Sequence, residues 1–120
     1  MNLSFLDDIV AWASTASWVM QMAVKALTIL ASLFPKAAEE IKNFVIGFFD
    51  LFDKKEAEEG IPVKKEEKLA ATDEIVMMIQ TKYHGSGSLI SESWIRAIVA
   101  LFVDVIKAMR YGEITARNEK

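Results

Sequence analysis

A nearly uncharged stretch close to the N-terminus constrains the fold more than any other feature. Residues 9–34 contain one ionisable side chain, Lys25, and no Gly or Pro. Ser4 with Asp7 three residues later resembles a helix-capping box, and Pro35 ends the stretch or opens a new helix as its first residue. The sequence therefore predicts one long apolar helix of about 26 residues, ~39 Å from end to end.

A narrow polar stripe runs along this expected helix. Its side chains are three or four residues apart, and at about 100° per residue they fall within an arc of roughly 80°. The rest of the circumference is apolar, and a helix this apolar is normally buried almost all round. We expect the stripe to mark an oligomerisation surface or to line a pore: Ser14, Ser17, Gln21, Lys25, Thr28 and Ser32.

Three environments could cover the apolar surface of residues 9–34. The helix is long enough to cross a ~30 Å hydrocarbon core, with Lys25 as the obstacle to that interpretation. It could instead be the central helix of a soluble bundle, with neighbouring subunits supplying the missing cover. A third arrangement, a helix lying flat in the membrane interface, is disfavoured because the polar arc is narrow and poor in basic residues.

Two amphipathic patterns and a charged segment follow. Residues 36–53 repeat large apolar side chains, four of them Phe, at helical spacing. Residues 54–71 are expected to form a charged linker, because nine charged residues lie between 54 and 67 and Gly60-Ile61-Pro62 interrupts the chain. The organisation predicted up to this point is a helical pair over residues 4–53 followed by the linker.

Residues 72–112 are predicted to form a second helical pair. Thr72 is placed to cap a short helix that ends near His84, and residues 85–88 (Gly-Ser-Gly-Ser) break the chain. The last helix should begin at a Ser88 or Ser91 cap, run to about Tyr111 and close at Gly112. Residues 113–120 read as a polar tail.

The expected fold class is all-α, with about four helices and no sheet, because sustained apolar and polar alternation is missing from the sequence. The apolar faces of the later helices are expected either to pack as an ordinary core, which the pattern favours, or to serve as interaction faces. The side chains concerned are Phe44, Phe48, Phe52, Trp94, Ile98, Phe102 and Met109.

Enzymatic chemistry is not expected from this composition. The chain has one His and no Cys, so it offers neither a His-based triad nor a zinc site of clustered His and Cys. The paired carboxylates lie in charged stretches where nothing apolar would raise a carboxyl pKa for acid catalysis. We expect no catalytic residues, no metal and no cofactor, and the net charge of -3 disfavours nucleic acid as a partner.

The preferred functional hypothesis is a non-enzymatic, membrane-associated assembly protein that forms homo-oligomers through its N-terminal helix. A virion membrane component or a pore-forming subunit would have this form, with lipid or other structural proteins as further partners. In layout the chain is similar to small phage holins, which combine few apolar helices with a charged tail. The alternative is a soluble, cytoplasmic helical adaptor or capsid-type subunit whose apolar helix is buried by neighbouring subunits.

Overall fold

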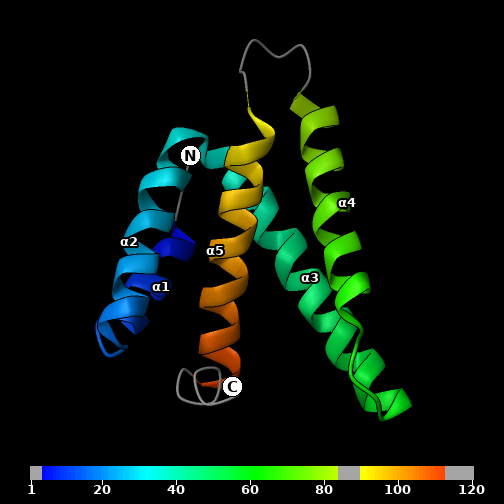
Figure 1. Cartoon of the computed structure of the whole chain (residues 1–120). Helices are drawn as coiled ribbons and strands as arrows, with labels where there is room; N and C mark the ends of the chain where they lie inside the picture. Colours follow the sequence, from blue (N-terminus) through cyan, green and yellow to red (C-terminus); the bar gives the residue numbers. More distant parts are fainter. Residues whose placement is uncertain (1–3, 84–89, 113–120) are drawn as a thin grey trace.

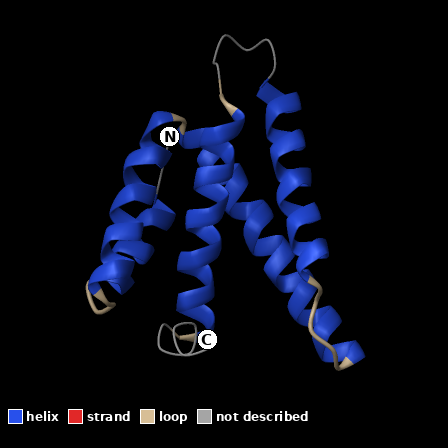
Figure 2. Cartoon of the chain, viewed as in Figure 1, coloured by secondary structure: helices blue, strands red, loops and turns tan. Residues whose placement is uncertain are grey.

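The computed structural model describes residues 4–83 and 90–112, and over these residues the chain forms five α-helices and no strand (Figure 2). The all-α prediction is therefore confirmed for the described part of the chain. His84, the 85–88 break and the 113–120 tail lie outside the described residues. The predictions of about four helices and of a single long N-terminal helix were wrong.

The expected N-terminal helix is divided into two, α1 (Ser4–Ala13) and α2 (Trp18–Leu33). Hydroxyl side chains accompany the break, and the main chain tightens there, because the Thr15 amide donates to the Trp12 carbonyl at 3.1 Å and the Ala16 amide to the Ala13 carbonyl at 3.0 Å. Ser14 Oγ donates to the Ala11 carbonyl at 2.7 Å and Thr15 Oγ1 to the Trp12 carbonyl at 2.9 Å. Ser17 then caps the new helix by accepting from the Met20 amide at 3.3 Å. A hydropathy pattern alone does not reveal these local hydrogen bonds.

Helix α3 (Pro35–Glu59) begins at Pro35 as its first residue and ends at Gly60. Pro is suited to the first helical position because its fixed φ is already helical and its missing N–H would have no partner there. Gly60 adopts a left-handed conformation with φ 72°, and its amide donates to the Glu56 carbonyl at 2.8 Å. Residues 54–59, expected in the linker, are thus the last turns of α3.

Helix α4 (Lys65–Tyr83) also takes in residues that were expected in the linker. The turn between α3 and α4 is only residues 60–64, and Lys55 pairs with Glu67 across it at 2.8 Å. Thr72 lies inside α4, where its hydroxyl donates to the Lys68 carbonyl at 3.3 Å, so it is not an N-cap. Mixed charge at helical spacing is compatible with a solvated helix, which is why composition misidentified this segment.

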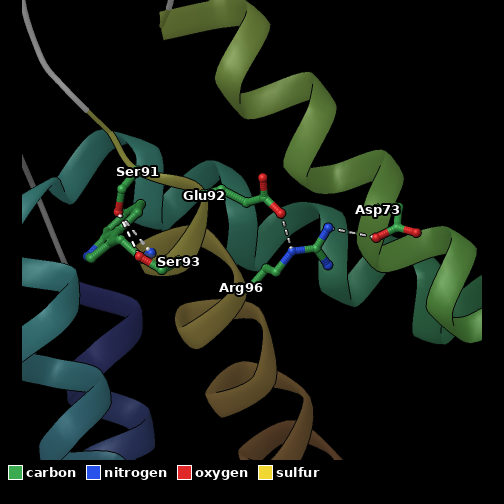
Figure 3. A network of polar contacts seen from close by, with 6 residues as sticks. Asp73, Ser91, Glu92, Ser93 and Arg96 are labelled. Carbon is green, nitrogen blue, oxygen red and sulfur yellow. Dashed lines mark hydrogen bonds and ion pairs between the residues drawn. The ribbon is translucent and has the colours of Figure 1, made fainter.

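Helix α5 (Glu92–Tyr111) has the ends that the sequence predicts. Ser91 Oγ accepts from the Trp94 amide at 3.1 Å, and the Gly112 amide donates to the Ala108 carbonyl at 2.9 Å. Figure 3 shows this N-terminal turn, together with Arg96, which reaches back to Glu92 at 2.7 Å and across to Asp73 of α4 at 2.9 Å.

The last helix is the centre of the packing. Helices α2, α3 and α4 all contact α5, whereas α1 packs on α2 (Figure 1). Five α5 side chains lie in the core and are 0–2% exposed: Ile95, Ile98, Val99, Phe102 and Val105. They meet fully buried partners on the surrounding helices, among them Leu27 of α2, Ile41 of α3 and Ile79 of α4.

Candidate functional site

The residues of the predicted polar stripe have different structural roles. Ser14 follows α1 and Ser17 caps α2, so neither belongs to a continuous stripe. Thr28 is half-buried and its hydroxyl donates to the Val24 carbonyl at 2.9 Å. The remaining three side chains are exposed on one side of α2: Gln21, Lys25 and Ser32.

An exposed apolar surface lies next to these three polar side chains, and we call it the α2 face. At about 100° per residue its members occupy an arc of roughly 100° that neither touches the core nor coincides with the polar strip. Trp18 is 71% exposed, and Ile29 and Leu33 are 59% and 60% exposed. The α2 face consists of Trp18, Val19, Met22, Ala26, Ile29 and Leu33, all of them exposed.

The expected interaction faces of the later helices are mostly used inside the molecule. Trp94, Ile98 and Phe102 are buried, and Phe44, Phe48 and Phe52 are half-buried. Met109 is 40% exposed. The ordinary core role, which the sequence pattern favoured, therefore describes the buried α5 residues.

A groove between α3, α4 and α5 is the second surface with functional potential. Its volume is about 320 Å³. Apolar side chains from all three helices line most of it: Phe48, Phe49, Leu69, Ile75, Val99 and Val103. This volume is near the lower limit for pockets that hold small molecules.

One end of the groove is charged. Asp53 accepts a hydrogen bond from the Tyr111 hydroxyl at 2.5 Å and lies 3.4 Å from the Arg110 guanidinium. Burial and the bond to Asp53 raise the pKa of Tyr111 to about 12. Arg110 also pairs with Asp50 at 2.9 Å and lies 5.6 Å from the centre of the Phe49 ring. These contacts fix the end of α5 against the second half of α3.

A separate polar cluster joins α3 to the end of α4. Glu40 accepts hydrogen bonds from both Lys82 and Tyr83. Partial burial raises the pKa of Glu40, but the bonds from Lys82 and Tyr83 outweigh burial and the net pKa is lowered. Burial and the bond to Glu40 raise the pKa of Tyr83 to about 12. The cluster holds two helices together, and every group in it already has a partner.

Within residues 4–83 and 90–112, no group of three or more His, Asp or Glu side chains is placed to hold a metal ion. None of the described helices combines the length and hydropathy of a membrane span.

Comparison with protein-family models, with curated proteins and with solved structures gives no match to this chain. The sequence pattern does not predict the groove, because its formation depends on how far apart α3, α4 and α5 lie. One signal was available: Val99, Val103, Lys107 and Tyr111 recur every four residues, and this row lines the groove on α5.

Proposed function

We propose that this protein is a non-enzymatic assembly protein whose copies associate through the α2 face. The observation that carries the proposal is that α2 buries one side against its own chain and leaves a contiguous apolar side exposed. Isolated exposed apolar residues are ordinary, but contiguous apolar patches with a polar rim are typical of interaction sites.

The order of side chains along α2 supports a second copy as the occupant. A two-fold interface must be self-complementary, because the same patch contributes to both sides. If two α2 helices cross antiparallel about a point between Lys25 and Ala26, Trp18 of each copy meets Leu33 of the other. Met22 then meets Ile29 in the same way, and the small Ala26 lies near the crossing point, where the backbones come closest.

The distribution of charge on α2 also favours a protein, and not lipid, as the partner that covers the α2 face. Gln21, Lys25 and Ser32 would lie along the edge of the paired helices, and a polar rim is usual in protein interfaces. An amphipathic helix that binds a membrane surface generally has several Lys or Arg on its polar face. Helix α2 has only Lys25.

The area of the α2 face determines how strongly two copies are expected to associate. Its exposed side chains present on the order of 500 Å² per copy, or about 1,000 Å² in a pair, which is near the lower limit for a specific interface. We therefore expect a reversible, concentration-dependent dimer as the basic unit of assembly.

Sedimentation equilibrium of the full chain tests this proposal. The wild type should be a dimer at about 100 µM, and Ile29→Glu should be a monomer because a buried, unpaired carboxylate is strongly unfavourable. Met77→Glu is the matched control, since Met77 is 69% exposed on α4 and lies outside the α2 face; this variant should remain a dimer.

Two results would overturn the proposal. One is a dimer that persists in Ile29→Glu, which would place the interface elsewhere. The other is a monomeric wild type that co-floats with neutral lipid vesicles while Ile29→Glu does not, which would assign the α2 face to a membrane surface.

A further inference from the structure

The groove between α3, α4 and α5 has an apolar end and a charged end. Helices α3 and α4 run antiparallel through the short 60–64 turn, and α5 runs antiparallel to α4 (Figure 1). The beginning of α4 and the ends of α3 and α5 therefore meet at the same end of the molecule. Lys65, Lys68 and Lys107 line the groove there, whereas Ile75 and Val99 line it farther along.

The two acidic side chains of the groove already have partners. Asp53 is bonded to Tyr111 and lies close to Arg110. A carboxylate oxygen of Glu56 accepts from the Val63 amide at 2.7 Å, which fastens the 60–64 turn. At least one oxygen of each carboxylate is therefore engaged away from the groove lysines.

The three lysines lack such close partners among the described residues, although Asp104 is an acidic neighbour of Lys107 on α5. Among the described residues, none of the ammonium groups of Lys65, Lys68 and Lys107 forms an ion pair within 4.0 Å. Three lysines and two carboxylates thus line the charged end of a groove that is otherwise mainly apolar, and the positive side chains are in excess. A ligand that complements it has an apolar body and a single anionic head.

We propose that the groove binds a single-chain fatty carboxylate. The acyl chain lies among Phe48, Phe49 and Val103, and the carboxylate lies among the three lysines. The volume of about 320 Å³ suits one acyl chain and not a two-chain lipid. Each further methylene that the groove buries should tighten binding about fourfold, until the groove is full.

Calorimetric titration of the full chain with decanoate, below the concentration at which decanoate forms micelles, tests the proposal. Decanoate should bind at one molecule per chain and at least tenfold more tightly than decan-1-ol, which has the same chain and no charge. Decylammonium, with the opposite charge, should bind more weakly than the alcohol.

Variants at exposed positions locate the site without disturbing the core. The combined change Lys65→Gln, Lys68→Gln and Lys107→Gln should lower decanoate affinity to that of the alcohol. The control changes Lys36→Gln, Lys54→Gln and Lys64→Gln remove the same charge outside the groove and should leave decanoate affinity unchanged.

A second pair of variants addresses the apolar part. Leu69 is 55% exposed and lines the groove, so Leu69→Glu places a negative charge beside the acyl chain and should weaken decanoate binding at least tenfold. Met77→Glu on the same helix lies outside the groove and should bind like the wild type.

The proposal is overturned if decanoate binds no better than decan-1-ol, or if the groove-lysine variant binds like its control. It is also overturned if Ile29→Glu on the α2 face abolishes binding while Leu69→Glu does not. Loss of self-association in Ile29→Glu with decanoate binding intact would keep the two proposals separate.

Discussion

The indole N–H of Trp94 donates to the main-chain carbonyl of Leu30 at 3.0 Å, and so joins the first turn of α5 to the last turn of α2. The Trp94 ring also meets Phe34 edge to face, with ring centres 5.0 Å apart. One side chain therefore fixes both the end of α2 and the start of α3 against the central helix.

Replacing Trp94 with Phe should test that bond while keeping an aromatic ring in the core. We expect a loss of about 1–3 kcal/mol in the free energy of unfolding, because the indole bond and part of the ring volume are removed. Urea unfolding followed by circular dichroism measures this change. A variant as stable as the wild type would contradict a structural role for the bond.

Phe102 and Met109 lie one heptad apart on α5, and their environments differ sharply. Phe102 is 0% exposed and Met109 is 40% exposed. Phe102→Ala should cost about 3–5 kcal/mol, a large part of the stability of a domain of this size, whereas Met109→Ala should cost less than about 1 kcal/mol. Similar unfolding midpoints for the two variants would disprove the burial pattern of α5.

The two tyrosines of the chain should lose their hydroxyl protons only at unusually high pH. Tyr83 and Tyr111 both donate to carboxylates, and burial with these bonds raises each pKa to about 12 from 10.0. Because the folded pKa is raised, the associated stability is fully present below pH 10 and is lost as the pH rises through about 12. Absorbance at 295 nm should give a folded midpoint near 12 and an unfolded midpoint near 10.

Single Tyr→Phe variants assign the two alkaline transitions. Tyr83→Phe and Tyr111→Phe should each remove half of the absorbance change and leave the remaining midpoint high. A wild-type midpoint near 10 in the folded protein would show that the bonds to Glu40 and Asp53 do not persist in solution.

Two serines near the α1–α2 break should respond differently to alanine. Ser17 Oγ satisfies a free amide at the start of α2, so Ser17→Ala should cost about 1 kcal/mol. Ser14 Oγ donates to a carbonyl of its own preceding turn, so Ser14→Ala should cost less than about 0.5 kcal/mol. Denaturant unfolding of both variants checks this order. If α2 did not begin at Trp18, Ser17 would cap no helix and the two variants should be equally stable.

Helix ends with specific stereochemistry were predictable from the sequence. Pro35 opens α3, which is one of the two roles expected for it. Ser91, one of two candidate caps, precedes α5, and Gly112 follows it as predicted. The break at residues 14–17 was not predictable from hydropathy, because hydroxyl side chains that bond to local carbonyls are also tolerated inside helices, as Thr28 of α2 and Thr72 of α4 are.

The surfaces were predictable only in part. The sequence indicated that residues 9–34 carry more apolar surface than the chain can cover, and the α2 face is the part left exposed. Which of its side chains are exposed depends on the position of α5, which lies some 70 residues later in the sequence. The groove depends on three helices together and has no local signature apart from the row that ends in Lys107 and Tyr111.

The central position of α5 has a consequence for biosynthesis. A ribosome makes α1 to α4 before α5, yet three of these helices bury their apolar sides against α5. Until α5 has left the exit tunnel, Leu27, Ile41 and Ile79 lack the α5 side chains of the core that they share. While α5 is still missing, the nascent chain must therefore expose apolar surface of the kind that chaperones bind.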